Sequence, residues 1–96
     1  MHNGTGKAKN YLFNRNLSFE GEYVNDYRNG KGKEYDFFGK LIFEGEYLND
    51  KKNGKGKEYK NGKLIFEGEY INNSTKEGIE YDYTTGKVIF QGNYWN

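Results

Sequence analysis

The stretch GKLIFEGEY, residues 62–70, decides the fold of this chain. Its residues alternate between two unlike sets, and a period of two is typical of an extended strand with two different faces. One face carries Leu64, Phe66, Gly68 and Tyr70, and the other carries Ile65, Glu67 and Glu69. The residues before it, Lys57-Glu58-Tyr59 and then Lys60-Asn61-Gly62-Lys63, supply a short partner strand and an Asn-Gly turn, which is the strongest short hairpin signal. The stretch therefore predicts a β-hairpin.

The same hairpin is repeated along the chain. GKLIFEGEY also occupies residues 39–47, and GKGKEY occurs at 30–35 and at 54–59. The corresponding phenylalanines, at positions 19, 43, 66 and 90, are spaced by 24, 23 and 24 residues. We therefore predict one domain over residues 1–96, built from approximate repeats 3–26, 27–50, 51–73 and 74–96. The polar stretches 25–30, 49–54 and 72–76 are interpreted as connections between successive hairpins, and no helical pattern is found.

A glycine stands inside the second strand of every repeat. Glycine is unfavourable in a strand interior, because it has no side chain to pack and loses the most backbone entropy on folding. These structural glycines are Gly21, Gly45, Gly68 and Gly92. Each lies between two aromatic residues of the same face, so we expect it to leave a notch in which a ring from the adjacent hairpin lies flat.

The composition indicates a small ordered domain. Hydrophobic residues make up 33% of the chain and mean hydropathy is −1.16, yet 18 residues are Phe, Tyr or Trp, whereas disordered chains are poor in aromatic residues. The absence of cysteine excludes disulfides, thiolate zinc sites and cysteine nucleophiles. A net charge of +1 with mixed signs disfavours nucleic acid as a partner. No apolar run approaches the length of a membrane span and the N-terminus lacks an apolar signal segment, which favours a cytoplasmic location.

The repeated residues resemble the MORN repeat, whose unit has an aromatic, a glycine two residues later, an aromatic two after that, and then a spaced glycine pair. The first part matches at Phe19-Gly21-Tyr23, Phe43-Gly45-Tyr47, Phe66-Gly68-Tyr70 and Phe90-Gly92-Tyr94. The spaced glycines match at Gly4/Gly6, Gly30/Gly32 and Gly54/Gly56, and by half at Gly78. The Asn-Gly-Lys-Leu turn at residues 61–64 is similar to a bacterial-type variant of this repeat.

The resemblance implies an all-β fold: an elongated, single-layer antiparallel sheet of tandem β-hairpins, with a groove lined by aromatic residues and glycines. It implies a non-enzymatic scaffold that binds proteins, often as a dimer, with association to membranes or the cytoskeleton as further locations. The candidate groove residues are Phe19, Tyr23, Phe43, Tyr47, Phe66, Tyr70, Phe90 and Tyr94. Two interpretations of these rings stay open, because they can contact a partner or pack within the chain.

Two further binding modes are considered. The strand that ends at Tyr94-Trp95-Asn96 is followed by no hairpin, so its unpaired backbone groups could pair with a second copy of the chain. The alternative function is a peripheral membrane module, in which Lys51, Lys52, Lys55 and Lys57 contact anionic phospholipid headgroups. The sequence identifies neither the partner nor the oligomeric state.

Catalytic and metal-binding constellations find no support. The single histidine, His2, lies near the N-terminus, and neither Ser18 nor Ser74 has a histidine close in sequence. The paired acids Glu20/Glu22, Glu44/Glu46 and Glu67/Glu69 are expected to form a solvated face that alternates with lysine-bearing strands. We therefore predict no enzyme activity, no cofactor and no metal.

Overall fold

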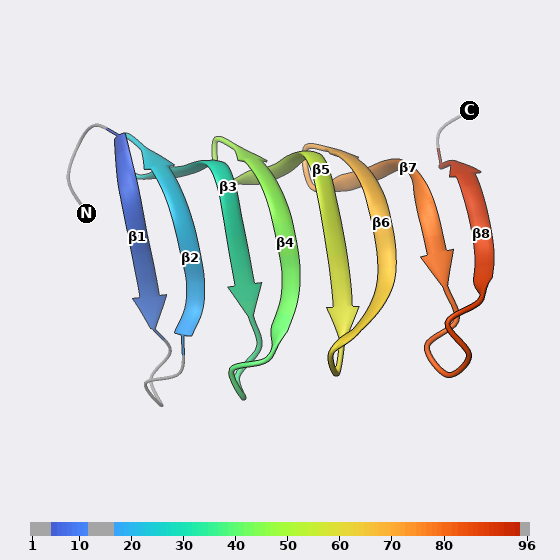
Figure 1. Ribbon diagram of the computed structural model, residues 1–96. Coiled ribbons are helices and arrows are strands. Elements are labelled where there is room, and N and C mark those ends of the chain that lie inside the picture. The colour runs from blue at the N-terminus through green and yellow to red at the C-terminus, as the bar shows by residue number, and fades with distance from the viewer. Residues whose placement is uncertain (1–4, 12–16, 95–96) are drawn as a thin grey trace.

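The computed structural model describes residues 5–11 and 17–94, whose regular structure is entirely β (Figure 1). The strands are β1 (Thr5–Tyr11), β2 (Leu17–Val24), β3 (Tyr27–Tyr35), β4 (Leu41–Leu48), β5 (Lys51–Lys60), β6 (Lys63–Ile71), β7 (Ser74–Tyr81) and β8 (Val88–Asn93). They form a single antiparallel sheet in sequence order, within a flat body of 42 × 32 × 14 Å. The predicted fold class, an elongated single-layer array of tandem β-hairpins, is confirmed.

Two-residue turns join successive strands at one end of the sheet. These turns are Asn25-Asp26, Asn49-Asp50 and Asn72-Asn73, and all six residues have positive φ between 49° and 72°. Two consecutive residues of positive φ make the type I′ turn that matches the twist of a hairpin. The prediction of longer polar connections at 25–30, 49–54 and 72–76 was therefore wrong, since only the first two residues of each turn the chain and the rest continue as strands. Asn and Asp tolerate the left-handed region of φ and ψ. The Asn-Asp and Asn-Asn pairs at these positions were therefore the sequence signal for two-residue turns, and it was missed.

One residue of each strand lies in a row across the sheet, and in seven of the eight strands this residue is glycine. Cross-strand pairing joins, from β1 to β8, Ala8, Gly21, Gly32, Gly45, Gly56, Gly68, Gly78 and Gly92. The strands approach closely here, because a Cβ added at Gly68 would lie 2.1 Å from the carbonyl oxygen of Glu77 and 2.6 Å from Cα of Gly78. In β1 the register places Gly6 opposite Tyr23 and Ala8 opposite Gly21. The spaced pair is thus Gly6/Ala8 rather than Gly4/Gly6, and Gly4 lies outside the described residues.

Aromatic rings fill one side of this glycine row. Phe19 contacts Tyr23 of its own strand and Tyr47 of the following hairpin, both edge to face, with ring centroids 5.7 and 5.4 Å apart. Phe43 repeats both contacts with Tyr47 and Tyr70. The notch at Gly32 receives the Phe19 ring, whose Cζ lies 2.5 Å from the position of a Cβ there, and the Tyr47 ring, whose Cε1 lies 3.1 Å from it. The expectation placed such a notch at Gly21, Gly45 and Gly68, but the nearest atoms there are backbone of the next strand and the Phe ring of the same strand. The ring from an adjacent hairpin lies instead against Gly32 and Gly56 of the partner strands, and the rings pack edge to face rather than flat.

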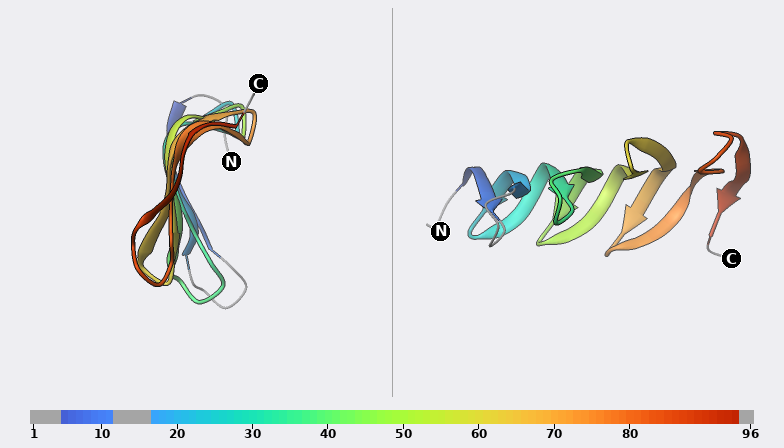
Figure 2. Two further views of the ribbon diagram at one scale, coloured as in Figure 1. Left: turned by 90° about the vertical axis from the view of Figure 1, so that its right-hand side faces the viewer. Right: turned by 90° about the horizontal axis from the view of Figure 1, so that it is seen from below.

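A repeated bend closes the sheet over these rings. One residue of β2, Glu22, faces three residues of β3, because Gly21 pairs with Gly32 and Tyr23 pairs with Arg28. Gly30 in this bend has φ +104°, and Oε1 of Glu22 accepts a hydrogen bond from the backbone N–H of Lys31 (2.7 Å). β4 and β5 repeat the bend with Glu46, Gly54 and Lys55. Seen end-on, the strands curl at this level (Figure 2), so a single-layer sheet covers its own aromatic face.

Candidate functional site

The eight predicted groove residues come together, but mostly inside the protein. Phe19, Tyr23, Phe43, Tyr47, Phe66 and Tyr70 are between 1% and 7% exposed and make up the core. Tyr94 is half-buried against this core, and Phe90 is 38% exposed. The sequence left open whether these rings contact a partner or pack within the chain. Six of them pack within the chain, so they offer little accessible surface to a partner.

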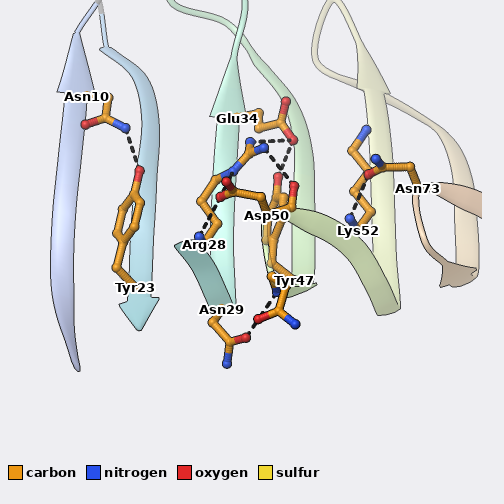
Figure 3. A network of polar contacts seen from close by, with 10 residues as sticks. Asn10, Tyr23, Arg28, Asn29, Glu34, Tyr47, Asp50, Lys52 and Asn73 are labelled. Atoms are coloured by element: carbon orange, nitrogen blue, oxygen red, sulfur yellow. Dashed lines mark hydrogen bonds and ion pairs between the residues drawn. The ribbon is translucent and has the colours of Figure 1, made fainter. Parts of the chain in front are cut away.

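Each tyrosine of the ring cluster is hydrogen-bonded to a polar side chain from the other strand of its own hairpin. The hydroxyl groups of Tyr47, Tyr70 and Tyr94 donate hydrogen bonds to Glu34, Glu58 and Glu80, respectively. Burial, followed by the adjacent carboxylate, raises the pKa of all three tyrosines. In the first hairpin Asn10 takes the place of the glutamate and donates to the hydroxyl of Tyr23 (Figure 3). These contacts hold the rings in place along the whole array.

Cationic side chains cover the rings of two repeats. The guanidinium of Arg28 lies 5.4 Å from the ring centroid of Phe19 and 5.1 Å from that of Tyr47. It also pairs with Asp50 (3.3 Å) and with Glu34 (3.9 Å), as Figure 3 shows. Lys52 takes the same position one repeat later, with Nζ 4.3 Å from the Phe43 centroid. Sequence reasoning missed this cover, although Arg28 and Lys52 occupy equivalent positions, five residues after Tyr23 and Tyr47.

An open groove crosses the other face of the sheet. The side chains of the residues before and after each glycine project from the face opposite to the aromatic rings, because successive residues of a strand point to opposite faces of the sheet. Over β1–β5 they border a hollow of about 880 Å³, and over β5–β8 they border a second one of about 480 Å³. Lys55, Gly56 and Lys57 line both hollows. The result is one continuous groove with a floor of glycine backbone and two rows of polar side chains, which we call the glycine-floored groove.

The charges along the glycine-floored groove alternate from strand to strand. Lys33 pairs across the sheet with Glu20 and Glu44, and Lys57 pairs with Glu44 and Glu67, as the sequence predicted for a solvated face. At β7 and β8 the lining residues include Ile79, Gln91 and Asn93. The groove is therefore charged over most of its length and largely neutral at one end.

Four glutamates of the groove are already hydrogen-bonded within the chain. Oε1 of Glu20 accepts from the hydroxyl of Tyr35 (2.7 Å) and Oε1 of Glu44 from that of Tyr59 (2.6 Å). Burial and these carboxylates raise the pKa of Tyr35 and of Tyr59 to about 12. Glu22 and Glu46 accept backbone N–H groups at the bends. The lysines between them are exposed, and within residues 5–11 and 17–94 the ion pairs are the two of Arg28. The groove thus presents ammonium groups that are free to contact a partner.

The four lysines of the membrane hypothesis do not share one surface. Lys52 is held over the aromatic core, whereas Lys55 and Lys57 border the glycine-floored groove on the opposite face. Lys51 is exposed at the start of β5. The structure therefore does not assemble these residues into a basic patch.

The remaining sequence candidates show no catalytic arrangement. The hydroxyl of Ser18 donates to the backbone carbonyl of Asn10 (2.9 Å), and Ser74 is exposed at the start of β7. In the part of the chain that the structure describes, no three His, Asp or Glu side chains gather as a metal site would require. His2, Trp95 and Asn96 lie outside that part.

Comparison with known proteins agrees with the architecture. Residues 19–36 and 43–64 match the model of the MORN repeat family. MORN repeats are generally associated with protein-binding and membrane-binding modules and are not typically enzymatic. The search of curated proteins returned no match. None of the described residues form a helix that is long and apolar enough to cross a membrane.

Proposed function

Because residues 19–36 and 43–64 are MORN repeats within a continuous array of like hairpins, we propose that the chain is a non-enzymatic protein-interaction module. The observation that carries this proposal is the glycine-floored groove, which crosses all eight strands and provides about 880 Å³ over β1–β5 alone. Its occupant is an extended segment of a partner polypeptide.

The shape of the groove supports an extended chain as the occupant. The groove runs across the strands, so each strand advances it by about 4.8 Å. Because the glycines of the floor have no side chains, the backbone of a partner can approach the sheet closely. The exposed lysines on both sides then contact carboxylate or carbonyl oxygens of the partner. The candidate aromatic residues support this surface from behind, because the Phe rings lie against the glycines that form its floor.

The edge strands offer a second route to association, with another copy of the chain as the partner. β8 carries three exposed apolar side chains, Val88 (52%), Ile89 (63%) and Phe90 (38%). An exposed apolar edge of a sheet pairs readily with another strand. Hydrodynamic mass that stays constant over a broad dilution series, and that is the same for an Ile89→Lys variant, would contradict a homodimer formed in this way.

Selection of linear peptides tests the groove directly. A phage library of random peptides is selected on the wild-type protein, and the enriched sequences are then measured against a Lys33→Glu/Lys57→Glu variant. Both positions lie on the exposed groove face, but each new glutamate faces two others across the sheet, so the variant should lose about 1–3 kcal/mol of stability. Peptide affinity, measured where circular dichroism shows the variant to be folded, should fall at least tenfold. Lys51→Glu is the matched control outside the groove. Peptides that bind the groove variant as tightly as the wild type would refute the assignment.

A further inference from the structure

The lysines of the glycine-floored groove form three equivalent pairs. Each pair flanks one residue of the floor, which is Ala8 in β1, Gly32 in β3 and Gly56 in β5. Residues i and i+2 of a strand are about 6.6 Å apart, so one carboxylate fits between two such side chains and accepts a hydrogen bond from each ammonium group. We call them the lysine pairs, and all six side chains are exposed: Lys7/Lys9, Lys31/Lys33 and Lys55/Lys57.

The glutamates between the lysine pairs leave the ammonium groups available. β2 and β4 lie between the lysine-bearing strands β1, β3 and β5 (Figure 1), and their glutamates accept hydrogen bonds from tyrosine hydroxyls and backbone N–H groups. Within residues 5–11 and 17–94 the ion pairs are those of Arg28, so no lysine pair has an ion-pair partner there. Six lysines and four glutamates line the groove over β1–β5, which therefore attracts an anionic partner.

The floor of the groove offers no main-chain hydrogen bonds to an occupant. The backbone groups of β2–β7 pair with a strand on either side, and these bonds lie in the plane of the sheet. A polypeptide that crosses the strands on this face therefore cannot satisfy its own N–H and C=O groups by adding to the sheet. A polyproline II helix suits such a site, because it has no internal hydrogen bonds and its backbone stays solvated.

The spacing of the lysine pairs matches the same helix. Successive pairs are two strands apart, which is about 9.6 Å at about 4.8 Å per strand. Three residues of a polyproline II helix rise about 9.3 Å and complete one turn, so every third side chain faces the same side. Over the three pairs the two spacings differ by only about 0.6 Å in total. An extended β segment does not match, because its side chains return to one face every second residue, at about 6.8 Å.

We propose that the glycine-floored groove selects a polyproline II segment that carries an acidic residue at every third position, with one carboxylate between the two lysines of each pair. This inference rests on the proposed function and specifies the partner of that site. The segment needs about seven residues to reach all three pairs. Its acidic register ends at β5, because none of the described residues that line the groove over β6–β8 is a lysine.

Two synthetic peptides of equal length and composition test the period. In Glu-Pro-Pro-Glu-Pro-Pro-Glu the acids recur at every third residue, and in Pro-Glu-Pro-Glu-Pro-Glu-Pro they recur at every second. Fluorescence anisotropy measures the affinity of each peptide for the full chain at low and at physiological salt. The first peptide should bind about tenfold more tightly, because the second places only one carboxylate at a time over a lysine pair. Equal affinities would overturn the inference.

A coupling measurement tests the register. Lys31→Gln/Lys33→Gln removes the middle pair without placing like charges opposite the neighbouring glutamates, and Lys51→Gln/Lys87→Gln is the charge-matched control outside the groove. Replacing the middle Glu of the first peptide by Gln should weaken binding to the wild type and to the control about threefold. The same replacement should have no effect on the middle-pair variant. An equal effect on all three proteins would show that the carboxylate does not lie at this pair, and the inference fails.

The library selection separates this inference from the proposed function. If selected peptides lose affinity for the Lys33→Glu/Lys57→Glu variant while the two synthetic peptides bind equally well, the groove binds polypeptides without reading this period, and only the inference is refuted. If neither the selected nor the synthetic peptides respond to substitutions in the groove, the inference and the proposed function are both refuted.

Discussion

Substitution of Gly68 by alanine tests the close packing at the centre of the array. A Cβ at this position would lie 2.1 Å from the carbonyl oxygen of Glu77 and 2.6 Å from Cα of Gly78, whereas ordinary contacts begin at 3.4 Å. Both atoms belong to backbone, so no side-chain rotation relieves the overlap. β6 and β7 must separate locally by about 1 Å, and we expect this overpacking to cost about 3 kcal/mol.

The sign of the effect is as informative as its size. Replacing a strand glycine by alanine normally stabilises a protein by about 0.5–1 kcal/mol, because the unfolded chain loses freedom. A domain of this length has a total stability of about 5–14 kcal/mol, so the expected loss is a large fraction of it. The melting temperature should fall by roughly 12–24 °C.

Urea and thermal unfolding followed by far-UV circular dichroism measure this effect. Ala8 occupies the same row in β1, and Ala8→Gly is the control, with an expected loss of only about 0.5–1 kcal/mol. If Gly68→Ala is as stable as the wild type or more stable, the row of glycines does not owe its existence to close strand approach, and the reasoning fails.

Three further predictions concern the polar contacts around the rings. Tyr70→Phe removes the hydrogen bond to Glu58 and should cost about 1–3 kcal/mol; a double-mutant cycle with Glu58→Met, which removes the acceptor, would contradict this if it showed no coupling. Arg28→Thr removes the cation above two core rings and should cost about 1–2 kcal/mol, whereas Arg28→Lys should lose less than half of that in urea unfolding. The folded-state pKa of Tyr35 and of Tyr59 is raised from 10.0 to about 12. Their contribution to stability is therefore complete below pH 10 and is lost as the pH rises from 10 to 12, so urea midpoints should fall over this interval while absorbance reports tyrosinate.

Strand pattern and repeat length made the hairpin array predictable. The alternation of GKLIFEGEY indicates a strand with two faces wherever it occurs, and the phenylalanine spacing requires the same unit each time. The family resemblance rested on these same residues, and the match at residues 19–36 and 43–64 confirms it.

The open face of the sheet could not be predicted in the same way. Alternation separates two faces but does not say which one the chain covers. That depends on the bend opposite Glu22, where one residue faces three. Such a bulge changes the path of the strand without changing the local hydrophobic pattern. We therefore expected the aromatic side to be the groove, whereas the hollow lies on the lysine and glutamate side.

The packing of the core phenylalanines and tyrosines also makes the two ends of the array different. Phe19 and Phe43 each pack against a glycine of the next strand and a tyrosine of the strand after that. Tyr23, without a phenylalanine on its preceding side among the described strands, is still only 7% exposed, whereas Phe90 is 38% exposed. The repeats are therefore not equivalent, because the burial of the phenylalanine in each repeat depends on the repeat that follows it. Under tension or during thermal fraying, such an array should open from its β8 side, one hairpin after another.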